Sequence, residues 1–342
     1  MIELRPNDPC ICGSGKKWKG CHDPKSGKAK PVSPGLPKGD RVDETLFSLG
    51  LQIVDFFEQV LAAIRLDILH RDRRLAQLCI AFYASKLYRV TLAGLTLIYH
   101  KQGVEALTIK REQYYYWLAL HYYAEKQEEA VLFMASQPLR QRDSAQEIIS
   151  FDKEVAADPV RQEQLAQLLR QCEQSYRDFP GLRRSKGKSG NASNPVLIDW
   201  QEPNARVMID ALAEGWVRED AGKKREPLDD VEFARRVNLV ARRIHYFHAD
   251  APGKEKHGTP LALNQALDFE GDFTMRPGAL DYEDSNELLW SYLVYPVGAL
   301  NTLCKFNALD ELANRYNELH KALLAQKERF GGEDDAGLFE FS

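Results

Sequence analysis

The chain has 342 residues, a formal net charge of −4 and a charged content of 28%. This length accommodates one small module together with one or two domains that have their own hydrophobic cores. The near-neutral charge balance argues against a protein whose whole surface binds nucleic acid, but local basic patches are compatible with it.

The first 25 residues combine four metal-ligand side chains with many lysines. Cys10 and Cys12 are one residue apart, and Cys21 and His22 follow after eight intervening residues. Three thiols and an imidazole in so short a segment suit a closed tetrahedral Zn²⁺ site with no position left for a substrate. The alternative is a disulfide, but two cysteines one residue apart bridge poorly. We therefore predict a structural zinc module over residues 1–25.

These residues, RPNDPCICGSGKKWKGCH, resemble the SEC-C zinc knuckle. This motif is best known at the C-terminus of the SecA translocation ATPase, and it is appended to many other bacterial proteins. His22 stands where a fourth cysteine is more usual. The resemblance implies an adaptor that docks an acidic protein, with a SecB-like chaperone as the model partner.

A basic surface surrounds the expected metal site and contains one aromatic side chain. A positive surface with an aromatic residue can dock an acidic protein or a phosphate backbone, so we expect a protein partner and keep RNA or the ribosome as alternatives. The other interpretation is a solvated basic face without a partner. The residues expected to carry the contact are Lys16, Lys17, Trp18 and Lys19.

The rest of the chain predicts an all-α fold, a multi-helix bundle preceded by the small zinc knuckle. Residues 26–42 form a Pro/Gly/Lys-rich linker, residues 43–330 form a helical domain, and residues 331–342 form an acidic tail. No strand-type alternation of any length is present. The predicted helices cover residues 46–69, 73–101, 104–136, 143–179 with a break at Asp158–Pro159, 204–217, 228–249, 286–306 and 310–330.

The stretch from Leu288 to Cys304 contains no charged residue and is interrupted by Pro296. Its length favours a buried helix over a membrane span. The other scattered cysteines, Cys79 and Cys172, lie in helical patterns and predict free thiols of a reducing compartment. Since no basic-then-apolar signal segment begins the chain, we expect a cytoplasmic protein without a membrane span.

Three pieces of the helical domain resemble a family of helical bacterial domains of unknown function that are often joined to SEC-C knuckles. They are GVEALTIKREQYYYWL, DWQEPNARVMIDAL and HYFHADAPGKEKHGTP. The resemblance implies a helical bundle with the HG loop near a polar pocket, but no known reaction. The aromatic run from Tyr114 to Trp117 predicts core positions in preference to a stacking platform.

An enzymatic alternative comes from Arg242 and His248, with His257 in the following loop. Their spacing resembles that of the HEPN superfamily of helical ribonucleases, in which His moves a proton and Arg neutralises the phosphorane. The alternative function is therefore a metal-independent ribonuclease of toxin or phage-defence type. Two other Arg–His pairs have similar spacing, and a solvated arginine face with a helix-capping histidine explains the same residues. The sequence leaves the oligomeric state open, a homodimer included.

Overall fold

The structure is a computed structural model that divides the chain into two compact units, Met1–Val42 and Asp43–Ser342. The expected zinc knuckle, the linker up to residue 41 and the tail from residue 331 lie outside the described residues. The residues that the structure describes are 42–100, 102–151, 157–185, 197–224, 228–245, 267–268, 274–275 and 282–330.

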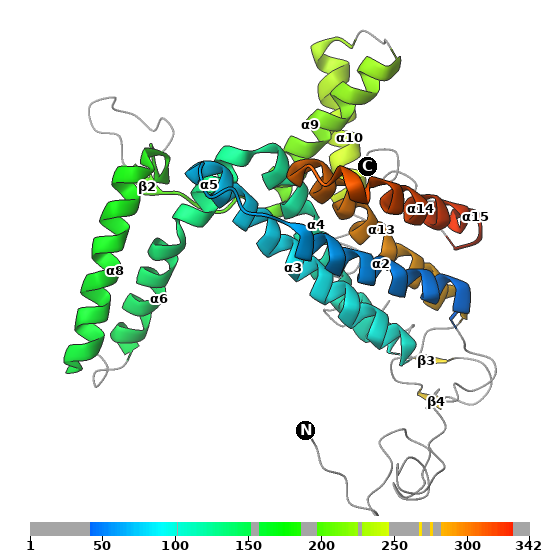
Figure 1. Ribbon diagram of the computed structural model, residues 1–342, viewed down its shortest axis with the longest axis horizontal. Helices are drawn as coiled ribbons and strands as arrows, with labels where there is room; N and C mark the ends of the chain where they lie inside the picture. Colours follow the sequence, from blue (N-terminus) through cyan, green and yellow to red (C-terminus); the bar gives the residue numbers. More distant parts are fainter. Residues whose placement is uncertain are drawn as a thin grey trace, which may run out of the picture. The chain divides into compact units, whose positions relative to one another are not determined.

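The second unit is helical, as the sequence predicts (Figure 1). Two short antiparallel strand pairs, β1 with β2 and β3 with β4, are additions that the sequence analysis does not foresee. The helices are α2 (Glu44–Ala63), α3 (Arg71–Tyr99), α4 (Gly103–Glu125), α5 (Gln127–Ala135), α6 (Gln137–Phe151), α8 (Pro159–Asp178), α9 (Ala205–Lys224), α10 (Asp230–His245), α13 (Tyr282–Asn307), α14 (Ala313–Ala325) and α15 (Lys327–Phe330), and the short elements are η2 (Pro180–Leu182), η4 (Asp310–Leu312), β1 (Arg183–Ser185), β2 (Leu197–Asp199), β3 (Leu267–Asp268) and β4 (Thr274–Met275).

Side-chain caps begin several of the helices where the sequence predicts a start, and Asp43 and Asp158 are two examples. The Asp43 carboxylate accepts a hydrogen bond from the backbone N–H of Leu46 at 2.9 Å. Asp158 caps α8 in the same way, and Pro159 occupies the first turn, where its missing N–H costs nothing. The predicted break in the polar segment after residue 143 is therefore confirmed.

Two predicted helices end earlier than expected. The helix predicted to continue to residue 69 ends at Ala63, because the side chain of Gln77 binds the backbone N–H of Asp67 at 2.7 Å and the carbonyl of Arg65 at 3.1 Å in a separate turn. The helix predicted over residues 104–136 is divided at Lys126, whose backbone leaves the helical region and joins α4 to α5.

The charge-free stretch of the sequence forms the centre of the core. Helix α13 packs against α2, α3, α4 and α14, and every residue from 288 to 300 is buried. The prediction of a buried helix is thus confirmed. Helices α2 and α3 have the length and apolar composition of a membrane span, a property that core helices share. The cysteines Cys79, Cys172 and Cys304 are free thiols and buried, as predicted.

Pro296 lies inside α13 and leaves one buried backbone group without its usual partner. Proline has no backbone N–H, so the carbonyl of Tyr292, four residues earlier, receives no helical hydrogen bond from it. The side chain of Gln113 in α4 donates to this carbonyl at 2.9 Å and to the hydroxyl of Thr91 in α3 at 2.8 Å. One buried amide therefore satisfies the defect in α13 and joins α3, α4 and α13.

The ring of Tyr292 requires a glycine on the neighbouring helix. A Cβ atom added to Gly94 of α3 would lie 2.2 Å from the ring, well inside contact distance. The Tyr292 hydroxyl donates to the carbonyl of Ala106 in α4. The Tyr292 side chain thus extends from α13 between α3 and α4. It can do so because Gly94 of α3 has no side chain at the place where the ring passes.

We predict that Gln113→Leu lowers the free energy of unfolding by about 1–3 kcal/mol, because it leaves the Tyr292 carbonyl unsatisfied. The same change should cost at least about 1 kcal/mol less in a Pro296→Ala background, where the restored N–H of residue 296 can bind that carbonyl. Urea titration followed by circular dichroism of the four proteins measures this coupling. Equal costs in both backgrounds would contradict the proposed pairing.

Candidate functional site

The structure places only part of the predicted ribonuclease site. Arg242 is exposed near the end of α10. His248 and His257 lie outside the described residues. The ribonuclease assignment therefore stays a prediction.

The two other Arg–His pairs are occupied by structural contacts. Arg65 donates to the carbonyl of Ala62 at 2.8 Å and so caps the end of α2, while His70 binds the Asp67 carboxylate at 2.8 Å. In α14, Arg315 pairs with Glu318 at 3.0 Å. His320 instead stacks on Tyr316, with 5.5 Å between ring centroids. Neither pair directs both side chains to one point.

The segment from Asp199 to Glu202 gathers side chains from five helices. The Asp199 carboxylate accepts from the Tyr176 hydroxyl of α8 at 2.6 Å and from Arg142 of α6 at 3.0 Å. Partial burial raises the pKa of Asp199, but these two hydrogen bonds outweigh it and hold the pKa below its usual value. The next residue, Trp200, is buried and donates from its indole to Glu129 of α5 at 2.8 Å.

Glu202 completes this cluster against α3, α4 and α6. It accepts hydrogen bonds from the hydroxyls of Tyr83 and, at 2.8 Å, Tyr115, and it pairs with Arg140 at 3.0 Å. Burial, followed by the hydrogen bond to Glu202, raises the pKa of both tyrosines well above the usual value, so both hydroxyls remain donors. With all of its strong acceptors engaged, this cluster is a structural clamp and presents no free general acid or base.

The aromatic run of α4 divides between the core and this clamp. Tyr114 and Trp117 are buried, which confirms the predicted core positions. Tyr115 turns the other way and reaches Glu202. Sequence reasoning missed the clamp, because its members are separated by up to about 120 residues along the chain.

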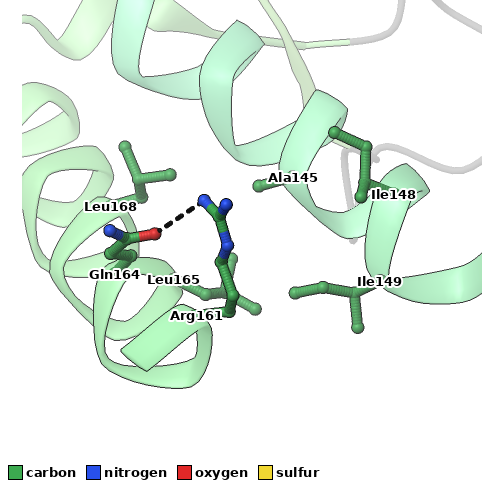
Figure 2. A pocket seen from close by; sticks show the side chains of 7 residues that line it. All are labelled: Ala145, Ile148, Ile149, Arg161, Gln164, Leu165 and Leu168. Atoms are coloured by element: carbon green, nitrogen blue, oxygen red, sulfur yellow. Dashed lines mark hydrogen bonds between the residues drawn. The ribbon is translucent and has the colours of Figure 1, made fainter. Parts of the chain in front are cut away.

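An apolar groove lies between α6 and α8, which run side by side (Figure 1). It encloses about 310 Å³. Figure 2 shows α6 contributing one wall and α8 the other, with the Arg161 guanidinium directed across the groove and donating to the Gln164 amide at 3.1 Å. The lining residues are Ala145, Ile148, Ile149, Arg161, Gln164, Leu165 and Leu168. The groove can receive an apolar side chain, but it holds no nucleophile.

His121 is a titratable group with an incomplete set of partners. Its Nδ1 lies 3.1 Å from the Thr302 hydroxyl, and its ring is tilted against the Trp117 ring, with 4.8 Å between the ring centroids. The residue as a whole is half-buried, yet Nε2 is shielded from solvent and has no hydrogen-bond partner among the described residues. Burial lowers the pKa of His121 to about 4, and the nearby charge of Lys305 acts in the same direction.

Comparison with protein families gives one match, the SEC-C motif, over residues 7–24. The match covers a small part of the chain and identifies the motif only, leaving the family of the helical domain unassigned. Searches of curated proteins and of solved structures found no significant match to the chain.

The residues of the matched segment fit a zinc ion by their chemistry. Cys10, Cys12 and Cys21 supply three thiolates and His22 one imidazole, a donor set that zinc binds in closed tetrahedral sites. Within the described part of the chain, no group of three or more His, Cys, Asp or Glu side chains is placed to hold a metal. The N-terminal donor set is therefore the candidate metal centre.

We predict that His121 makes stability depend on pH. Its folded pKa of about 4 lies below the ordinary value of 6.5, so the unfolded chain takes up this proton first as the pH falls. The contribution is complete above about pH 6.5 and is lost towards pH 4, up to about 3 kcal/mol. Burial also lowers the pKa of His320, which adds to the same trend.

The difference between the wild type and His121→Phe isolates the contribution of His121. Denaturant titrations at pH 7, 6, 5 and 4 should show that the free energy of unfolding of the wild type falls relative to that of His121→Phe as the pH falls. A parallel pH dependence in both would contradict the prediction.

Proposed function

We propose that this chain is a zinc-binding adaptor protein whose basic N-terminal knuckle docks an acidic protein in the cytoplasm. The observation that carries the proposal is the SEC-C match over residues 7–24, which contains all four donors. A site with four protein ligands leaves zinc no open position for a substrate, so the metal stabilises the fold of the module and does no chemistry. Binding is then the function that the module can serve.

The charge of the knuckle supports an acidic partner. Lys16, Lys17 and Lys19 lie within four residues of one another, and Trp18 stands between them. Acidic side chains on a partner would meet these ammonium groups, while the indole supplies apolar contact area. SecB is the acidic protein that the resemblance to SecA-type knuckles points to, and it serves as the first probe.

The ribonuclease alternative has no comparable support among the described residues. Of its three residues, only Arg242 is described, and its side chain is exposed on a helix. The alternative is retained as an outcome of the binding experiment, in which total RNA is tested beside the protein probe and examined for cleavage.

We predict one zinc ion per chain in the purified full-length protein. Elemental analysis should give a zinc-to-protein ratio near 1, and Cys12→Ser should lower it to less than about half, because three donors hold zinc weakly. Cys172→Ser is the matched control, since this buried thiol lies in α8 and should leave the ratio unchanged. A wild-type protein that carries no zinc after purification without chelators would refute the metal assignment.

We predict that the triple change Lys16→Glu, Lys17→Glu and Lys19→Glu weakens binding to purified SecB at least about tenfold and flattens its salt dependence. Titration calorimetry at two salt concentrations measures both effects, and zinc content is determined for each variant to show that the module is still loaded.

The control for this experiment reverses three lysines of the helical domain. Lys223, Lys224 and Lys321 are all exposed, so reversing them changes the net charge by the same amount. This control should bind as the wild type does. Equal losses of SecB affinity in both triple variants would show a net-charge effect only. Binding of RNA in place of SecB would indicate that the partner is RNA.

A further inference from the structure

Helices α6 and α8 form an arm that packs against fewer other helices than the rest of the helical unit does. Its two helices pack on each other, and their main other contacts are made with α5 and η2 at the base of the arm. In α8, Cys172 is the one buried residue. The apolar side chains Ile148 and Leu169 are 56% and 42% exposed, respectively. A pair of amphipathic helices buries its apolar faces fully only when further helices pack on it.

One side of α8, beside the groove, carries a row of four residues at intervals of four, and the first two of them, Arg161 and Leu165, also line the groove. Arg161 is followed by Leu165, Leu169 and Glu173. Residues four apart form a continuous ridge on a helix, and such ridges are the surfaces with which helices pack. The row therefore has an apolar centre, a positive end near the tip of the arm and a negative end towards its base.

We propose that this row docks the same row of a second copy of the chain in an antiparallel, twofold arrangement. The centre of the row falls at Gln167, halfway between its two charged ends. Rotation about a twofold axis at this point places Arg161 opposite the partner's Glu173 and Leu165 opposite the partner's Leu169. The row is thus complementary to itself only in the antiparallel orientation, since a parallel pairing sets arginine against arginine and glutamate against glutamate.

The charged ends of the row are available for this contact. Arg161 is exposed at the edge of the groove, and its hydrogen bond goes to the neutral amide of Gln164. The Glu173 side chain is 67% exposed and lies 3.8 Å from Arg183, at the outer limit for an ion pair. Neither contact occupies its group strongly, so each can form a pair across the interface.

The size of the surface fits a reversible dimer. Helix α8 has 20 residues, which gives a length of about 30 Å. With two helices about 10 Å apart, the face of the arm that carries the groove and the row offers roughly 600 Å² per protomer, at the lower limit of specific interfaces. We expect a dimer that forms in the micromolar range and dissociates on dilution.

Sedimentation velocity of the full-length protein from about 1 to 200 µM tests the proposal. The wild type should pass from monomer to dimer over this range, and Leu169→Glu should raise the dimer dissociation constant at least about tenfold. Leu239→Glu on α10 is the matched control, because Leu239 is also an exposed apolar residue of a helix. A monomer at every concentration, or a dimer that Leu169→Glu leaves intact, would overturn the proposal.

A charge exchange tests the antiparallel register. Arg161→Glu alone and Glu173→Arg alone should each weaken the dimer about tenfold, since each places like charges opposite one another. The double variant restores both cross-pairs and should return the dissociation constant to within about threefold of the wild type. Circular dichroism of each variant shows that the helices remain folded. Failure of the double variant to recover would exclude the twofold contact at this row.

Discussion

The buried amide of Gln113 is the constraint on which the helical unit depends. A proline in the central helix α13 removes one backbone donor at a position where no water can replace it. The unit therefore needs a donor from another helix at one fixed height, and Gln113 supplies it while also binding Thr91. Apolar packing alone would allow α4 to slide along α13, whereas this hydrogen bond fixes the register of three helices.

A second set of polar contacts holds the arm of α6 and α8 at its base. No such contacts are formed along the rest of the arm among the described residues. The segment from Asp199 to Glu202 holds α6 through Arg140 and Arg142 and holds α8 through Tyr176. These bonds lie at the base of the arm, so they orient it without covering the groove further out. An arm that is held firmly at its base and exposes apolar side chains beyond it is suited to contact another molecule with little loss of conformational freedom.

Local signals in the sequence predicted much of the helical unit. The charge-free stretch around Pro296 predicted the buried helix, and Asp158 with Pro159 predicted the start of α8, because both depend on neighbouring residues only. The division of the helix at Lys126 was missed, since its pattern of apolar residues continues across the break. The ending of α2 at Ala63 was missed because the side chain of Gln77, on the next helix, holds the turn.

The candidate sites divide in the same way. The metal ligands lie within 13 residues and are readable from spacing and residue type. The clamp around Glu202 joins residues from positions 83 to 202, and no rule of local spacing connects them. The four-residue interval of the row on α8 is visible in the sequence. Whether that row is exposed could not be predicted, because exposure depends on which faces of α8 the other helices cover.

The position of α13 in the chain has a consequence for how the protein is made. This helix ends at Asn307, about 180 residues after α4 ends at Glu125, yet α2, α3 and α4 all pack on it. At about 5–20 residues per second, the ribosome needs roughly 10–40 s to add those residues. During that interval the nascent chain displays the apolar faces of α2, α3 and α4 that pack on α13, without the helix that buries them. Co-translational folding of this unit is therefore delayed until α13 has been synthesised.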